Sequence, residues 1–182
     1  FGNLAAKFVG IQTAANLATA GIMKLVRDMG ELINTGIRME TLNLQMEAFT
    51  GGAAEAEAAM AQFLQIAANS PLNLEQVASA GKIMMAFGIS TEDAIESTRQ
   101  LAVVSAATGG DINLLARNLG QVSAQGRAYT RDLTQFAIQG IPIWEELSVV
   151  TGESVTSLKE MAKQGQIGFK EVQQAMANMT AE

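Results

Sequence analysis

Residues 109–126 read GGDINLLARNLGQVSAQG, and this stretch decides the fold class. Its apolar residues recur at intervals of three and four, which is the spacing of one face of an α-helix. They are Ile112, Leu115, Ala116, Leu119 and Val122. Asp111 can accept hydrogen bonds from the first N–H groups of such a helix, and Gly126 permits the left-handed conformation that ends one. The stretch therefore predicts a short amphipathic helix with a start and a stop of its own.

Short helices of the same kind are predicted on both sides of this stretch. Ser90 with Asp93 has the form of a variant capping box, and Pro142 suits a first helical turn. No run alternates with period two for long enough to predict a strand. The expected apolar stripes lie at residues 56–67, 74–87, 90–108, 130–139, 142–151, 155–162 and 169–179.

The composition supports the same fold class. Hydrophobic residues make up 48% of the chain and aromatic residues only 5%, with alanine and methionine prominent. Small residues let helices approach one another, and methionine fills irregular gaps between them. Proteins rich in β-structure usually contain more Val, Thr, Tyr and Trp. We therefore expect an all-α protein and, because the chain begins with Phe1, a piece of a longer polypeptide.

One long helix is predicted before the short ones, because an apolar seam runs from Leu4 to Met46. Its steps alternate between four and three, which is the 3.5-residue period of a coiled coil. Gly51-Gly52 ends it. We expect an oligomerising helix at residues 1–47, then a domain of seven or eight short helices at 48–182. The seam comprises Leu4, Phe8, Ile11, Ile22, Leu25, Met29, Leu32, Met39 and Asn43, with Ala15, Ala18, Gly36 and Met46 between or after them.

The positions beside the seam bear on the oligomeric state. Ala5, Ala14, Val26, Ile33 and Leu42 occupy several of them, and few are charged. A dimeric zipper usually carries Glu and Lys at these positions, so the wider apolar stripe favours a trimer or a higher oligomer. The alternative is a long amphipathic helix that packs on its own domain.

The sequence also excludes several kinds of chemical site. It has no cysteine and no histidine, which removes thiolate nucleophiles, the commonest general base and the commonest metal ligand. The adjacent acids Glu145-Glu146 and Glu92-Asp93 would point about 100° apart on a helix, which suits a solvated first turn better than an acid/base pair. No catalytic residue, cofactor site or metal site is predicted, and we do not expect an enzyme.

A net charge of −6 argues against a nucleic-acid backbone as the main partner. Four arginines nevertheless share a stretch in which Asp111 is the only acid. Ion pairing within the bundle, with Glu96 or Asp132, is the favoured interpretation, and a basic patch for DNA or an acidic partner is the alternative. The four are Arg99, Arg117, Arg127 and Arg131.

Two further features suggest alternative functions. The turn of Gly140, Ile141, Pro142, Ile143 and Trp144 holds the only tryptophan. It is either a buried corner or an exposed anchor through which a helical adaptor module holds one partner. The segment 8–23 is uncharged but contains polar residues and is shorter than the ~18 apolar residues of a spanning helix, so membrane insertion is a weaker alternative.

Several ordered motifs resemble the tape measure domain of tail tape measure proteins from long-tailed bacteriophages and prophages. The resemblance covers about residues 47–182. It rests on Ser70-Pro71-Leu72, Phe87-Gly88-Ile89-Ser90, Ala107-Thr108-Gly109-Gly110-Asp111, Gly120-Gln121-Val122-Ser123-Ala124-Gln125-Gly126-Arg127, Arg131-Asp132-Leu133, Gly140-Ile141-Pro142-Ile143-Trp144, Thr151-Gly152, Ser154-Val155, Gly165-Gln166-Ile167, Ala175-Met176 and Met179-Thr180.

This resemblance implies a structural role. Members of the family are long helical chains inside the tail tube, and their length sets the length of the tail. Tail assembly chaperones bind them in the host cytoplasm before the tail tube protein polymerises around them, and they leave the tube when DNA is ejected. Tail tip proteins are further implied partners, and a membrane-active segment used during ejection is an alternative. The family defines no catalytic residue to transfer to this sequence.

Overall fold

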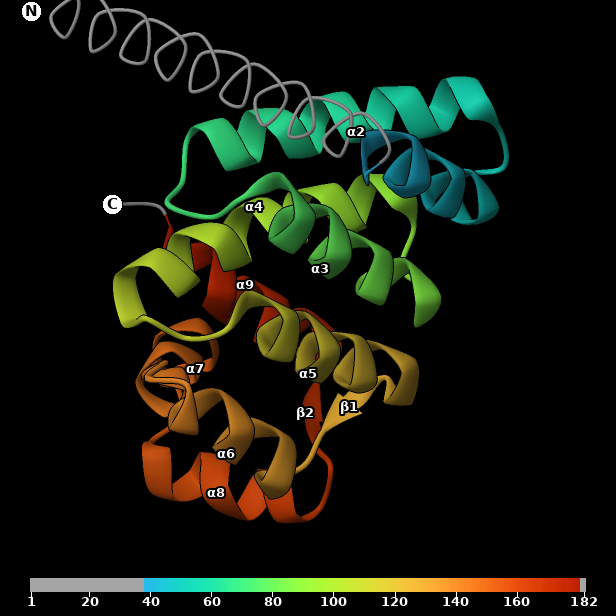
Figure 1. Cartoon of the computed structure of the whole chain (residues 1–182). Helices are drawn as coiled ribbons and strands as arrows, with labels where there is room; N and C mark the ends of the chain where they lie inside the picture. Colours follow the sequence, from blue (N-terminus) through green and yellow to red (C-terminus); the bar gives the residue numbers. More distant parts are fainter. Residues whose placement is uncertain (1–37, 181–182) are drawn as a thin grey trace, which may run out of the picture. The chain divides into compact units, whose positions relative to one another are not determined.

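The computed structural model describes residues 38–180, and these residues form an all-α fold, as predicted. The seam residues from Leu4 to Leu32 lie outside this range, so the long coiled-coil helix remains a prediction. Eight short helices follow residue 50 within the described part, in agreement with the predicted bundle (Figure 1). The elements are a helical segment at residues 38–50, α2 (Ala53–Ala68), α3 (Leu74–Ala86), α4 (Thr91–Thr108), α5 (Ile112–Gln125), β1 (Arg127–Ala128), α6 (Thr130–Ile138), α7 (Ile143–Thr151), α8 (Val155–Lys163), β2 (Ile167–Gly168) and α9 (Phe169–Asn178).

The helix boundaries follow from local capping chemistry. The Asp111 carboxylate accepts hydrogen bonds from the backbone N–H groups of Asn113 and Leu114, at 2.8 and 3.2 Å, at the start of α5. At the other end of α5, Gly126 has a φ of 70°, a left-handed conformation that costs glycine little. The predicted start and stop of this helix are therefore confirmed.

The capping of α3 and α4 differs from the prediction. The Ser90 hydroxyl accepts a hydrogen bond from the Asp93 N–H, but it also donates to the Asp93 carboxylate at 2.7 Å. The backbone N–H of Ser90 therefore gains no side-chain partner here, and the capping box is not closed. A complete capping box forms instead at α3, between Asn73 and Gln76. An amide at both positions satisfies the same two donors as the usual Ser and Glu.

Two very short strands were not predicted. β1 and β2 pair antiparallel, with Arg127 opposite Gly168 and Ala128 opposite Ile167. A strand of two residues cannot show the alternation that identifies a strand in a sequence. The pairing closes a loop of chain that contains α6, α7 and α8, so that α9 starts beside the end of α5 (Figure 1).

The core of residues 42–180 is built around two helices. α3 packs against α2, α4 and α5, and α9 packs against α7 and returns to α4 and α5. Glycines inside two helices permit this close packing, because aromatic rings occupy the space of a side chain. The Phe63 ring of α2 lies against Gly81 of α3, and the Phe87 ring lies against Gly120 of α5.

The helical segment at residues 38–50 contributes to the same core. The compact unit begins at Leu42, inside this segment, and Met46 is only 1% exposed. The Lys82 ammonium on α3 donates a hydrogen bond to the Gln45 side chain at 2.6 Å. The chain thus enters the compact unit as a helix.

Candidate interaction surfaces

Within the compact unit that begins at Leu42, the end of the predicted seam faces the core of its own chain. Met46 is buried in the core, and Met39 and Asn43 are half-buried. The side-chain oxygen of Asn43 is covered and has no hydrogen-bond partner among the residues that the structure describes. By contrast Leu44, on the opposite side of the same helix, is 63% exposed. Met46 is therefore not available to another chain, and association through the earlier seam positions stays a prediction.

The turn at residues 140–144 is mainly a buried corner. Ile141 and Ile143 are buried, and the Ile141 N–H donates to the carbonyl of Phe136 at 3.2 Å. Pro142 is exposed and forms the N-cap of α7, one residue earlier than its predicted place in the first turn. Gly140 provides the left-handed conformation, with a φ of 84°. The isoleucines therefore hold the turn in place and are not free for a partner.

Trp144 differs from the isoleucines of this turn. Its side chain is half-buried, and the Lys159 ammonium of α8 lies 5.8 Å from the ring centroid. A cation at this distance over an indole is attracted by the ring and also covers it. The tryptophan is therefore partly accessible to a partner, as is the exposed Pro142 of the same turn.

The arginine-rich stretch contains the ion pairs that were expected. Arg99 pairs with Glu96 along α4, and Arg131 lies 3.6 Å from the Asp132 carboxylate. Arg127 is instead stacked over Tyr129, with 5.7 Å between the guanidinium and the ring centroid. Pairing within the bundle therefore explains part of the arginine-rich stretch. Arg117 has no ion-pair partner among residues 38–180.

A cleft of about 290 Å³ lies between α5 and α6, beside Arg117 and Arg131. The glutamines Gln121, Gln135 and Gln139 also line it. The only acid of its lining is Asp132, whose side chain is 2% exposed. The accessible part of this cleft is therefore cationic and amide-rich.

Asp132 is buried because its carboxylate serves the backbone. One oxygen accepts a hydrogen bond from the Tyr129 N–H at 3.0 Å, at the start of α6. The backbone carbonyl of Asp132 in turn accepts from the Asn118 side chain at 2.9 Å. These two bonds attach the start of α6 to α5, so Asp132 has a structural explanation that needs no ligand.

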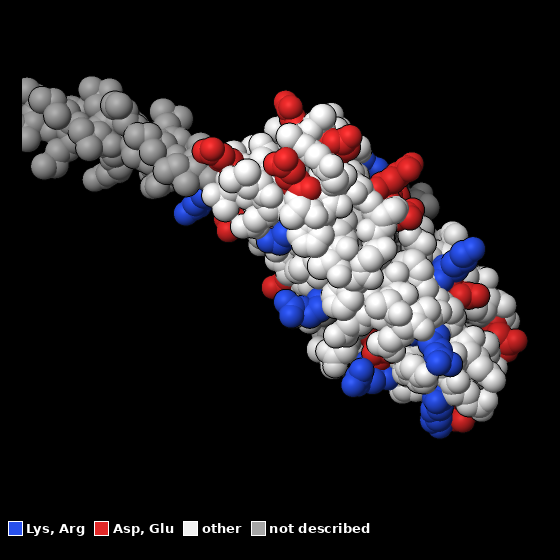
Figure 2. All heavy atoms as spheres, turned by 90° about the vertical axis from the view of Figure 1, so that its right-hand side faces the viewer, with Lys and Arg blue, Asp and Glu red and all other residues white. Residues whose placement is uncertain are grey.

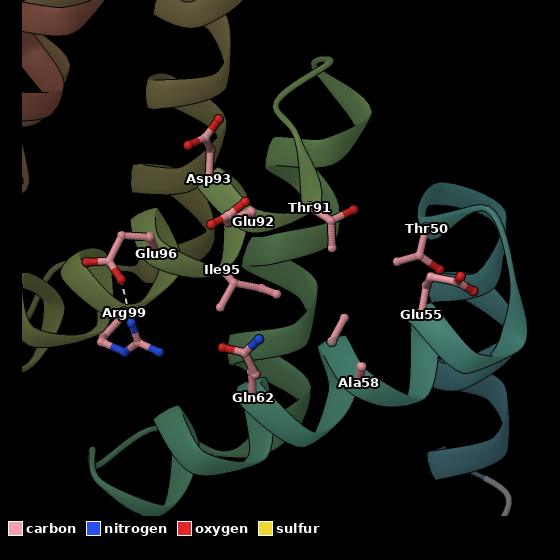
Figure 3. A pocket seen from close by; sticks show the side chains of 11 residues that line it. Thr50, Glu55, Ala58, Gln62, Thr91, Glu92, Asp93, Ile95, Glu96 and Arg99 are labelled. Carbon is pink, nitrogen blue, oxygen red and sulfur yellow. Dashed lines mark hydrogen bonds and ion pairs between the residues drawn. The ribbon is translucent and has the colours of Figure 1, made fainter.

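A second, larger hollow of about 770 Å³ lies between α2 and the start of α4 (Figure 3). Glu55 on α2 and Glu92, Asp93 and Glu96 on α4 give it an acidic lining. Arg99 is its one cationic lining residue and pairs with Glu96, as the dashed line in Figure 3 marks. Within residues 38–180, no group of three or more acidic side chains is arranged to hold a metal ion.

The acids are unevenly distributed over the surface. Figure 2 shows a group of carboxylates gathered at the upper end of the face in view, whereas lysine and arginine side chains are spread over this face, with further carboxylates among them. The two hollows differ in charge, since the acidic one is built from α2 and α4 and the cationic one from α5 and α6. The sequence contained one indication of the second, namely the run from residue 112 to 131 without an acid.

None of the helices in the described part is both long and apolar enough to cross a membrane. The uncharged segment at residues 8–23, which raised that alternative, lies outside the described residues.

The comparisons with known proteins point to one family. A family model described as Tape measure protein matches residues 30–182. The resemblance of motifs begins at about residue 47, whereas the family match begins at residue 30. The match therefore includes the helical segment at residues 38–50. No curated protein and no solved structure matches the chain. Because the family match covers most of its length, the chain belongs to the tape measure protein family and is a structural component of a phage tail that works with other tail proteins.

Proposed function

We propose that this chain is the part of the tail ruler at which a long axial helix enters a compact helical body. The helical segment over residues 38–50 carries this proposal, because it continues without a break across the boundary between Thr41 and Leu42 and is joined to the core through Met46. An axial helix before this body rises about 1.5 Å per residue. The length of the helix then contributes directly to the length of the tail.

Self-association through the seam is the second part of the proposal. Leu4, Phe8, Ile11, Ile22, Leu25, Met29 and Leu32 join three or more copies, while the last seam positions are used within each chain. The bundle lies along the lumen of the tail tube. Tail assembly chaperones, the tail tube protein and tail tip proteins are its partners, and the half-buried Trp144 is a candidate contact for one of them.

Tail length after insertion into the intact parent protein tests the ruler function. Four heptads placed between Leu25 and Met29, in register with the seam, should lengthen each tail by ~42 Å, since an axial helix rises about 1.5 Å per residue. Electron microscopy of assembled tails measures the difference. Tails of unchanged length would show that this helix is not part of the ruler.

A matched insertion separates length along the axis from added mass. The same residues inserted between Gly152 and Glu153, both exposed in the turn after α7, lie in the compact body and away from the entering helix. This variant should assemble tails of the parental length. Equal lengthening by both insertions would favour a ruler that counts residues rather than one that measures a helix.

A further inference from the structure

The two hollows of the compact body have opposite charge and no residue in common. The α5–α6 cleft presents Arg117 and Arg131, and its only acid is buried. The α2–α4 hollow presents Glu55, Glu92 and Asp93 beyond the Glu96 carboxylate that Arg99 already pairs. One chain therefore carries both halves of a complementary pair of surfaces.

The cationic cleft holds two guanidinium groups that remain accessible from outside, although Arg131 also lies 3.6 Å from the Asp132 carboxylate. Arg117 has no ion-pair partner among the described residues, and the Arg131 side chain is 80% exposed. Leu114, at the edge of the same cleft, is 49% exposed and adds an apolar contact surface. Guanidinium groups bind carboxylates in a bidentate manner, so the cleft is suited to exposed acids.

The acidic hollow likewise has free carboxylates. Glu55 and Glu92 are exposed and form no ion pair within residues 38–180. In Figure 3 the Glu92 side chain projects from the first turn of α4, and Glu55 projects from the first turn of α2. Both are available to a cation from outside the chain.

We propose that the α5–α6 cleft of one copy binds the acidic α2–α4 hollow of a second copy. Arg117 and Arg131 of the first copy contact the carboxylates of Glu55 and Glu92 of the second. Because two different surfaces meet, each copy keeps one free cleft and one free hollow, and the contact can continue from copy to copy. This contact is independent of the seam and goes beyond the proposed function.

A second copy fits the cleft better than a nucleic acid does. Phosphate binding needs several clustered cations, because each neutralised phosphate adds to affinity, and the cleft supplies only two arginines. The chain as a whole carries a net charge of −6, which repels a polyanion. An acidic surface of limited size is the better match.

A charge exchange tests the contact in the whole chain. In one variant Arg117→Glu and Arg131→Glu reverse the cleft, and in the other Glu55→Lys and Glu92→Lys reverse the hollow. All four side chains are exposed, and none is part of the core, so both variants should keep the parental circular dichroism spectrum. Sedimentation velocity then compares each variant with the parent at about 50 mM and about 500 mM salt, because salt screens such pairs.

The parent should show association that weakens at the higher salt concentration, and in each variant alone this salt-sensitive association should be at least tenfold weaker. An equimolar mixture of the two variants should regain the parental association, since every contact in the mixture again joins opposite charges. Failure of the mixture to associate would overturn the proposal. So would variants that associate like the parent, or a cleft variant whose only loss is binding of a duplex DNA probe.

The Leu25→Asp variant separates this contact from the seam. Loss of the seam should remove the oligomer that persists at high salt and leave the salt-sensitive association in place. If Leu25→Asp removed all association at low salt, the seam would be the only self-contact and the head-to-tail contact would be excluded. A parent chain that showed only salt-sensitive association, with no oligomer at high salt, would contradict the seam and leave the head-to-tail contact in place.

Discussion

The Phe63 ring of α2 lies against Gly81 of α3 so closely that a Cβ atom on Gly81 would stand 2.2 Å from the ring carbon Cζ. Phe63 is fully buried, and Gly81 is buried within its helix. Glycine in a helix interior costs about 1 kcal/mol relative to alanine, so its presence here is explained by the ring that it admits. Gly120 of α5 has the same relationship with Phe87, at 2.3 Å.

The first prediction concerns this ring. Gly81→Ala should lower the free energy of unfolding by about 1–3 kcal/mol, because the methyl group overpacks the core by more than the gain in helix propensity. Urea denaturation measures the change. In a Phe63→Leu background the same substitution should cost much less or become stabilising. A cost that is the same in both backgrounds would show that the ring is not the obstacle.

The second prediction separates the two faces of the entering helix. Met46→Asp should destabilise the compact body by ~3 kcal/mol or more, because it buries an unpaired charge. Leu44→Asp, on the exposed side of the same helix, is the matched control and should change stability little. Thermal unfolding of the two variants checks this. If the two variants unfolded alike, the helix would not be part of the compact body.

The third prediction concerns the start of α5. Asp111→Ala should cost about 1 kcal/mol, because the N–H groups of Asn113 and Leu114 lose their acceptor. Asp111→Asn keeps a side-chain oxygen and should restore most of the stability. Chemical denaturation of both variants gives the comparison. An equal loss in both would assign the effect to the charge rather than to the cap.

The fourth prediction concerns the buried carboxylate of Asp132. Asp132→Ala should cost about 1–3 kcal/mol, because the partly buried Tyr129 N–H is left without an acceptor. Arg131→Ala should have little effect, since the ion pair places an exposed guanidinium at 3.6 Å and the carboxylate keeps its backbone bond. Hydrogen exchange at the Tyr129 amide reports the local effect directly. Slow exchange retained in Asp132→Ala would contradict this role.

The short-range features of the fold could be read from the sequence. Asp111 and Gly126 bound α5 because capping and the left-handed conformation depend on residues within one turn of each other. The same holds for Ser154 before α8 and for Gly152 after α7. Helix number and fold class follow from such local rules, repeated along the chain.

The sequence alone thus determined the all-α class, the helix boundaries and the family resemblance, because each depends on neighbouring residues. The tertiary structure alone decided which way Met46 faces, where β1 meets β2, and which arginines remain unpaired. A period of 3.5 residues identifies an apolar face of a helix but not the surface against which that face packs. Met46 packs into the core of its own chain. Likewise, whether Arg117 and Arg131 find an ion-pair partner depends on the position of the Asp132 carboxylate. That position is set when α6 packs against α5.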